Sequence, residues 1–564
     1  MKQKRIVVIG GSAAGPKAAS RARRMDENAQ LTIIQKSKEL SMASCGYPYY
    51  VGGFFDDRDQ LLCSPAGVVR DSRYFWNAKR IETKVECEVT SIDPKKREVV
   101  YTSLEDGAEN RILYDKLVIA TGATPRMPSV PGVELDGITT LQSMHDADFL
   151  RKIKDEGKIK KAVVIGGGLI GIETCEALHL AGIEITLVEM LPQLLTFLDM
   201  QMAKLVENYV RTKANVILEN GVSSFLGEDG KLVGVKLQNG TEIPCELAVV
   251  AIGVIPNVKL AKEIGVKIGE RGGIVVDQYM ESNIPDIYAV GDCVEIKNLI
   301  SKSSVHAPFG DLANLQGRVA GENIIVGNRK RFEGTIQTGI CKVFDWNVGS
   351  TGLSEQNAIR NGITNYEIVF NSSLDKPGFM QGKLLITKLI VDKGDRTILG
   401  AQVLGPGDVG KQVAIWAMAI KAKMGVEEMI NADLPYAPPF SLAIDHSIAT
   451  AHIMQNKLDG LMDGVTALEL KSRLDNRDSI TLIDVRNPDE FEEMRLGVGE
   501  VLIPLGQLRG RIGELPQDKS TPIVTWCKIS LRGYEAALIL KANGYTNVKV
   551  LEGGIVAWPF YRER

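Results

Sequence analysis

The chain opens with short apolar runs separated by one helical stretch. Residues 5–10 have the pattern of a buried parallel strand, a glycine-rich turn follows, and the helical stretch continues to Arg24. Residues 31–34 form a second apolar run. The order strand, helix, strand predicts a βαβ unit of the kind that opens a dinucleotide-binding fold.

The turn of this first unit matches the dinucleotide fingerprint in part. Gly10 and Gly15 occupy the first and third glycine positions, but Ser12 replaces the second glycine. Gln35 stands where an acidic residue is expected to hold a ribose hydroxyl. The pattern predicts a nucleotide site that departs from the usual one in two positions.

A second unit, beginning near residue 161, carries the full fingerprint. Gly166, Gly168 and Gly171 have the required spacing, and the following strand ends in Glu189. A carboxylate there accepts from an adenosine 2′-hydroxyl and repels a 2′-phosphate, which favours NADH over NADPH. Two such units predict two dinucleotides, one held and one exchanged.

Composition narrows the function classes. The 564 residues are 44% hydrophobic and 24% charged with a net charge of −3, so three to four globular domains are expected and no nucleic-acid partner is indicated. No apolar stretch approaches a membrane span and no signal-peptide core is present, so we expect a cytoplasmic protein without a membrane partner. Eight scattered cysteines form neither a disulfide nor a zinc pattern, and no metal is expected.

Cys45 is the most informative of these thiols. It lies about thirty residues after the first turn, and no Cys-x-x-Cys or Cys-x4-Cys partner follows it. It begins a Cys-Gly-x-Pro turn, and the adjoining helix end is expected to lower the thiol pKa. The pattern indicates single-cysteine redox chemistry.

Four further segments carry a family resemblance. Lys116–Gly122 and Asp286–Asp292 end strands in the manner of flavin-dependent pyridine nucleotide-disulfide oxidoreductases, which the chain resembles over about residues 1–455. The Cys45 segment, Lys342–Asp345 and Tyr436–Pro439 resemble the single-cysteine branch. That branch contains coenzyme A disulfide reductases, NADH oxidases and peroxidases, and NADH-dependent persulfide reductases.

The C-terminal hundred residues resemble a rhodanese domain. Ser479–Arg486, the strand ending in Cys527 and the loop to Arg532 carry this resemblance, which implies roles for Arg486, Cys527 and Arg532 at the site. Backbone N–H groups and a helix start around Cys527 would stabilise a thiolate or persulfide. The turn Met494–Gly497 departs from the family's Gly-His-Ile.

Together the resemblances imply an α/β protein with two nested Rossmann-type domains, an α+β dimerisation domain and a C-terminal α/β rhodanese domain. The expected bounds are 1–150 with 281–325 for FAD, 151–280 for NAD(P)H, 326–452 for dimerisation, 453–465 for a linker and 466–564 for the rhodanese domain. A homodimer is implied, in which Tyr436 would complete the active site of the partner subunit.

The resemblance also implies two sets of cofactor contacts. The FAD set is Gly10, Ser12, Ala14, Gly15, Gln35, Lys36, Thr121, Gly122 and Asp292. The NADH set, with NADPH possible, is Gly166, Gly168, Gly171, Glu173, Glu189 and Gly253.

Coenzyme A is a possible substrate or bound thiol. Arg21 and Arg24 on the first helix could reach its phosphates, with Ser41 and Ser44 beside the thiol, although the arginines could equally form a solvated helix face. Several positions that contact coenzyme A in family members differ here, so the identity of the thiol carrier stays open.

The leading hypothesis is an NADH- and FAD-dependent reductase of persulfides, polysulfides or coenzyme A disulfides. Cys45 would be the redox cysteine, Cys527 would carry sulfur, and Tyr436 or water would deliver protons. One alternative is an NADH oxidase or peroxidase that cycles Cys45 through a sulfenic acid. Another is a sulfurtransferase whose flavin module is a redox-gated scaffold.

Overall fold

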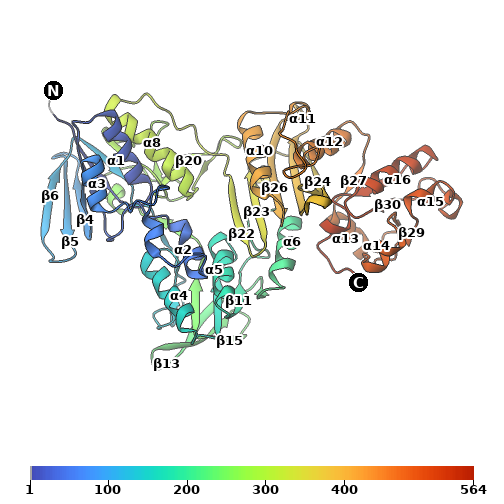
Figure 1. Ribbon diagram of the computed structural model, residues 1–564, viewed down its shortest axis with the longest axis horizontal. Helices are drawn as coiled ribbons and strands as arrows, with labels where there is room; N and C mark the ends of the chain where they lie inside the picture. The colour runs from blue at the N-terminus through green and yellow to red at the C-terminus, as the bar shows by residue number, and fades with distance from the viewer. Residues whose placement is uncertain (1–2, 564) are drawn as a thin grey trace. The chain divides into compact units, whose positions relative to one another are not determined.

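The computed structural model describes residues 3–563 and divides them into two compact units (Figure 1). The first unit holds residues 3–192 and 214–335, and the second holds residues 193–213 and 336–563. The expected α/β class with two Rossmann-like sheets, a dimerisation domain and a rhodanese domain is confirmed.

The N-terminal sheet of the first unit is parallel throughout, and helices pack on its apolar strands. Its strand order is β19 (Ile287–Ala289), β7 (Lys116–Ile119), β1 (Arg5–Ile9), β2 (Gln30–Ile34) and β3 (Ile81–Lys84). Helices α1 (Ala14–Met25) and α8 (Gly310–Val326) lie side by side (Figure 1). Their contact requires small residues, since a Cβ at Gly317 would lie 2.4 Å from the carbonyl oxygen of Ala14.

The second parallel sheet of this unit repeats the arrangement. Its order is β12 (Asn215–Ile217), β11 (Glu184–Val188), β10 (Lys161–Ile165), β16 (Leu247–Val250) and β9 (Ile138–Thr139). Helices α4 (Met144–Glu156) and α5 (Leu169–Leu180) accompany it. A capping box formed by Ser143 and Asp146 fixes the start of α4.

Shorter elements complete the first unit. The antiparallel sheets are β4 (Cys87–Asp93), β5 (Glu98–Ser103) and β6 (Glu109–Leu113), and β13 (Val222–Glu228), β14 (Lys231–Leu237) and β15 (Glu242–Pro244). The other strands are β8 (Ala123–Pro125), β17 (Val254–Pro256), β18 (Ile274–Val275), β20 (Val294–Lys297) and β21 (Ser304–Val305). The short helices are η1 (Ser44–Gly46), α2 (Tyr47–Gly52), η2 (Arg58–Leu62), α3 (Ser72–Lys79) and α7 (Lys259–Glu263).

The second unit begins with an antiparallel sheet. Its order is β22 (Gly339–Val343), β23 (Trp346–Gly352), β26 (Ile398–Gly405), β25 (Leu384–Asp392) and β24 (Tyr366–Leu374). Its helices are α6 (Met200–Val210), α9 (Glu355–Arg360), η3 (Gly378–Met380), α10 (Val409–Lys421), α11 (Val426–Ile430) and α12 (His446–Leu458). Helix α6 groups here because buried Lys388 contacts Asp199 at its start, with Nζ 2.8 Å from Oδ2.

The C-terminal part of this unit is a parallel sheet covered by helices. Its order is β27 (Gly464–Val465), β31 (Val548–Leu551), β30 (Ile523–Trp526), β28 (Thr481–Asp484) and β29 (Val501–Leu502). Its helices are α13 (Ala467–Asp475), α14 (Pro488–Glu493), α15 (Leu505–Leu508), η4 (Ile512–Glu514), α16 (Leu531–Ala542) and η5 (Ile555–Ala557).

Buried ionic contacts join this C-terminal part to the antiparallel sheet. The Glu552 carboxylate is 1% exposed, accepts from the Phe370 N–H at 3.0 Å and from the Lys457 ammonium at 2.6 Å. Lys457 lies in α12, which runs to Leu458, so the first six residues of the segment expected to be a linker are helical. The two domains therefore pack against one another within the unit.

No helix in residues 3–563 is long and apolar enough to cross a membrane. Across the same residues, no group of three His, Cys, Asp or Glu side chains has the arrangement of a metal site.

Candidate active sites

The first glycine turn is too tight for any other residue at two positions. Gly10 has φ +108°, and a Cβ there would lie 2.0 Å from the Ala120 carbonyl oxygen. A Cβ at Gly15 would lie 1.9 Å from the Gly10 carbonyl oxygen. Strand and helix therefore approach closely, and α1 begins at Ala14 just beyond the turn, which fits a pyrophosphate at the helix start. Ser12, at the middle position, is exposed.

The second turn repeats this geometry. Gly166 has φ +109° and its Cβ would lie 2.4 Å from the Ala251 carbonyl oxygen, while a Cβ at Gly171 would lie 1.9 Å from the Gly166 carbonyl oxygen. Gly168 faces open space. The chain can therefore hold a second dinucleotide by the same means.

Gln35 and Glu189 occupy equivalent positions and make equivalent bonds. The Gly11 N–H donates to Gln35 Oε1 at 2.7 Å, and the Gly167 N–H donates to Glu189 Oε2 at 2.7 Å. The amide of Gln35 therefore replaces the acid as a support for the turn. Glu189 retains a charge that suits ribose hydroxyls. Lys36, next to Gln35, pairs with Glu88 at the surface.

Further predicted cofactor residues gather at the carboxyl edges of the two parallel sheets. Thr121 Oγ1 donates to the Asn257 carbonyl at 2.6 Å, and the Asn257 side-chain amide donates to the Thr121 carbonyl at 2.9 Å. Asn257 was not predicted, because its contact spans 136 residues. Gly122 and Gly253 have positive φ values and face open space.

Asp292 follows β19 at the carboxyl edge of the first sheet. Burial raises the pKa of its carboxyl group, and His306 opposes that shift. The His306 ring nitrogen Nε2 contacts the Asp292 carbonyl oxygen at 2.7 Å and holds the backbone there. A half-buried carboxyl at this edge fits a hydroxyl-bearing chain such as that of FAD.

Cys45 is an exposed residue of η1, the short helix that leads into α2. A Cβ added at Gly310, the first residue of α8, would lie 3.7 Å from the Cys45 Sγ. Local desolvation raises the pKa of the thiol, and the carboxylates of Glu173 and Asp292 raise it further. The expectation of a lowered pKa was therefore wrong, because desolvation and then the acidic neighbours raise it and outweigh the backbone hydrogen bond at Cys45.

Glu173 forms a pair that the sequence did not reveal. Tyr49 lies four residues after Cys45, and its hydroxyl donates to Glu173 Oε1 at 3.1 Å. Burial raises the pKa of Glu173 to about 7, while the hydrogen bond from Tyr49 opposes the shift. A carboxyl group that exchanges its proton near neutral pH therefore acts electrostatically on Cys45.

The residues proposed to bind coenzyme A have mixed surroundings. Arg21 donates through Nε to Glu322 at 3.1 Å, so its charge is already paired, whereas Arg24 is exposed. The Ser41 N–H donates to the Gly11 carbonyl at 2.7 Å, and Ser44 is exposed at the start of η1. The two arginines therefore do not form one common anion site.

Tyr436 belongs to the second unit and is 54% exposed. It borders two surface grooves, one that includes Ile444 and His452 and another that includes Lys376 and Phe440. An exposed aromatic residue between two grooves is available to a second subunit.

Cys527 closes β30 and is 1% exposed. The Ile555 N–H donates to the Cys527 carbonyl at 3.0 Å, and the Ser530 hydroxyl donates to the Leu551 carbonyl at 2.9 Å. A Cβ at Gly554 would lie 2.6 Å from the Cys527 carbonyl oxygen. The loop that leads into α16 is therefore fixed by hydrogen bonds to the segment 551–555.

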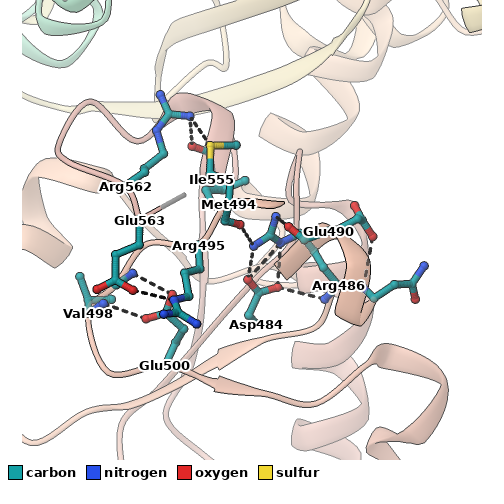
Figure 2. Close-up of polar contacts among 12 residues, drawn as sticks. Asp484, Arg486, Glu490, Met494, Arg495, Val498, Glu500, Ile555, Arg562 and Glu563 are labelled. Carbon is teal, nitrogen blue, oxygen red and sulfur yellow. Dashed lines mark hydrogen bonds and ion pairs between the residues drawn. The ribbon is translucent and has the colours of Figure 1, made fainter. Parts of the chain in front are cut away.

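Arg486 is a support of this site and not a member of the loop. It is 2% exposed and forms a two-pronged ion pair with Asp484, with contacts of 2.7 and 3.0 Å. Figure 2 shows the same guanidinium donating to the carbonyls of Glu490 and Met494, at 2.8 and 2.6 Å. Arg486 thus fixes α14 and the turn after it.

Arg562 ties that turn to the segment behind the cysteine loop. Its Nη1 lies 3.7 Å from the Met494 sulfur and donates to the Ile555 carbonyl at 3.3 Å (Figure 2). Glu563 pairs with Arg495 through side chains and backbone. The Met494–Gly497 turn, which departs from the family pattern, is therefore held by residues 562 and 563.

Comparison with known families assigns all three parts of the chain. Residues 4–307 match the pyridine nucleotide-disulphide oxidoreductase family, residues 338–448 match its dimerisation domain, and residues 466–559 match the rhodanese-like domain.

Individual proteins are similar over most or all of the chain. A NAD-dependent persulfide reductase from A. fulgidus is 42% identical with a TM-score of 0.93, and the match covers 98% of this chain and 100% of that one. A Methanocaldococcus jannaschii NADH oxidase is 32% identical over 78% of this chain and 96% of its own. A Pyrococcus horikoshii NAD(P)H coenzyme A polysulfide/persulfide reductase is 31% identical over 80% and 99%.

Proposed function

Because this chain belongs to the pyridine nucleotide-disulphide oxidoreductases, we propose that it is an NADH-dependent flavoenzyme that reduces persulfides, polysulfides or coenzyme A disulfides. When bound, FAD accepts two electrons from NADH and supplies them to sulfur. In this proposal Cys45 is the redox cysteine and Cys527 carries sulfane sulfur.

The isolation of Cys45 carries the proposal. None of the eight cysteines, which all lie within residues 3–563, forms a disulfide, and Cys45 is the exposed one, beside the first residue of α8. Its thiolate can attack a persulfide R–S–SH to give Cys45–S–S–R and HS⁻. Two electrons and a proton then return the Cys45 thiolate and release R–SH.

The rhodanese-like domain favours sulfur substrates over dioxygen. The Cys527 thiolate can take sulfur from R–S–SH to give Cys527–S–SH and R–S⁻. Similarity to the A. fulgidus persulfide reductase covers 98% of this chain, so it includes this domain. A sulfur-carrying domain has a use in a persulfide reductase and little use in an oxidase.

Coenzyme A as the carrier has weaker support. Coenzyme A appears in the name of the Pyrococcus horikoshii relative, and the exposed Arg24 is available to bind one of its phosphates. Arg21 is paired with Glu322 and would have to leave that partner. The charge of Glu189 supports NADH as the donor, with NADPH a weaker one.

A homodimer completes the proposal. The match to the dimerisation domain and the exposure of Tyr436 support a subunit interface at which this tyrosine reaches the partner's site. Eight cysteines without a disulfide suit the reducing cytoplasm.

The test is anaerobic NADH oxidation by the FAD-loaded protein. Coenzyme A persulfide, coenzyme A disulfide and inorganic polysulfide are compared side by side, with sulfide release measured in each case. We expect sulfide to appear in step with NADH loss for at least one sulfane-sulfur substrate. No oxidation with any of the three would contradict the proposal.

A second candidate, NADH oxidase, is favoured by the similarity to the Methanocaldococcus jannaschii enzyme. Cys45 would then form a sulfenic acid. NADH oxidation that needs air and ignores all sulfur substrates would support it. Transfer of sulfur that ignores NADH and survives Cys45→Ser would instead indicate a sulfurtransferase with a flavin scaffold.

A further inference from the structure

The rhodanese-like domain contains a charged contact beside its cysteine. Glu490 in α14 and Arg532 in α16 face one another, with Nη1 2.7 Å from Oε2 and Nη2 2.7 Å from Oε1. Two parallel bonds fix the plane of a guanidinium as well as its distance. Both side chains are partly exposed, so the pair lies at the mouth of the site.

Glu490 is itself held from the other side. The Arg486 guanidinium donates to the Glu490 carbonyl at 2.8 Å (Figure 2). The Asn487 N–H donates to Glu490 Oε2 at 3.2 Å. Bonds from Arg532, a backbone N–H and the nearby charge of Arg486 lower the pKa of Glu490 to about 2. The carboxylate is therefore ionised and fixed at all working pH values.

Arg532 is the charged neighbour of the Cys527 sulfur. The two hydrogen bonds to Glu490 raise the pKa of Arg532, and the Cys527 sulfur raises it further. Lys528, the other basic residue of the loop, is exposed, and Arg486 is occupied by Asp484. The Arg532 charge is thus the one directed at the sulfur within the described loop.

We propose that Glu490 is a positioning residue of the rhodanese-like site, whose carboxylate holds the Arg532 guanidinium against the sulfur of Cys527. Glu490 touches neither the sulfur nor a substrate and acts through Arg532. The orientation matters because an unanchored arginine has many rotamers and spends little time near the sulfur. The inference rests on the proposed role of Cys527 as a sulfur-carrying nucleophile.

The test measures alkylation of Cys527 in the full-length FAD-loaded protein. Iodoacetamide incorporation into the Cys527 peptide is followed by mass spectrometry from pH 5 to 9. The variants are Glu490→Gln, Glu490→Ala, Arg532→Ala and the double variant Glu490→Ala with Arg532→Ala. Glu492→Gln is the matched control, since Glu492 is an exposed acid of the same helix.

We expect Glu490→Ala to raise the midpoint of alkylation by about half a pH unit and to slow alkylation at pH 7 about threefold. Glu490→Gln keeps the size and one acceptor and should fall between Glu490→Ala and the parent. The control should match the parent, and Glu490→Ala should have no further effect once Arg532 is removed.

Three results would overturn the proposal. A lower midpoint in Glu490→Ala would show that Glu490 only competes with the sulfur for the charge of Arg532. A midpoint equal to the control in both Glu490 variants would show no role. An undiminished Glu490 effect without Arg532 would show that it acts by another route.

Failure of the sulfur-carrier role is visible separately. The parent protein is incubated with thiosulfate and with glutathione persulfide, and cyanide-releasable sulfur on Cys527 is measured. Absence of such sulfur would refute the proposed function of Cys527, while the alkylation profiles would still decide the role of Glu490. A thermal unfolding midpoint equal to that of the parent reports that the rhodanese-like domain of each variant is folded.

Discussion

The two cysteine sites have opposite electrostatic surroundings. Cys45 is exposed, and local desolvation followed by the charges of Glu173 and Asp292 raises the pKa of its thiol. Cys527 is buried, and its charged neighbour is the Arg532 guanidinium. One site has carboxylates near its sulfur and the other has a guanidinium there, which suits a cysteine that reacts in turn with a reductant and a cysteine that stores a negatively charged persulfide.

The largest effect should come from removing the storing sulfur. In Cys527→Ser, thiosulfate:cyanide sulfur transfer should fall by about 1,000-fold, since the nucleophile is gone. Anaerobic NADH oxidation with a small persulfide should continue, because it uses Cys45. Steady-state rates of both reactions on one FAD-loaded preparation check this. Loss of both sulfur transfer and NADH oxidation would show that the Cys527 and Cys45 sites do not act independently.

Removing the positive charge of Arg532, next to Cys527, should have the next largest effect. Arg532→Met keeps the length of the side chain but not the guanidinium, so sulfur loading of Cys527 should slow about tenfold. Lys528→Met is the matched control, because it removes a positive charge from the same loop at an exposed position. The amount of cyanide-releasable sulfur on Cys527, measured in samples quenched at successive times, gives the rate of loading. Equal losses in both variants would assign the effect to net charge alone.

Removing a carboxylate near Cys45 should have the smallest effect and a defined pH dependence. The Glu173 pKa is about 7, so the group is neutral below that pH and ionised above it. Only the ionised form disfavours the Cys45 thiolate. Glu173→Gln and the parent should therefore react alike with iodoacetamide below pH 6, and the variant should react about threefold faster above pH 8. Alkylation of the Cys45 peptide measures this, and a variant slower at high pH would contradict the assigned role of the carboxylate.

Local patterns predicted the parts of the sites that are close in sequence. The glycine turns at Gly10 and Gly166 and the cysteine at the end of β30 could be identified because each lies within a few residues of the strand that positions it. That Gln35 supports its turn in the same way as Glu189 became clear only from the bonds that the two side chains accept from the turns.

Contacts between distant segments could not be predicted from one sequence. Tyr49 and Glu173 are 124 residues apart, and Arg21 and Glu322 are 301 apart. The first pair gives Cys45 a titrating neighbour, and the second occupies a side chain expected to bind phosphate. The sign of the Cys45 pKa shift was missed for the same reason, since it depends first on desolvation by the surrounding chain and then on carboxylates from distant segments.

The central claim is that Cys45 is the redox residue through which NADH reduces sulfane sulfur. The most direct measurement is anaerobic sulfide release by a Cys45→Ser protein that retains FAD, with coenzyme A persulfide and NADH supplied together. The account predicts that release falls to the uncatalysed rate while NADH still reduces the bound FAD. Sulfide release at the parent rate would contradict it.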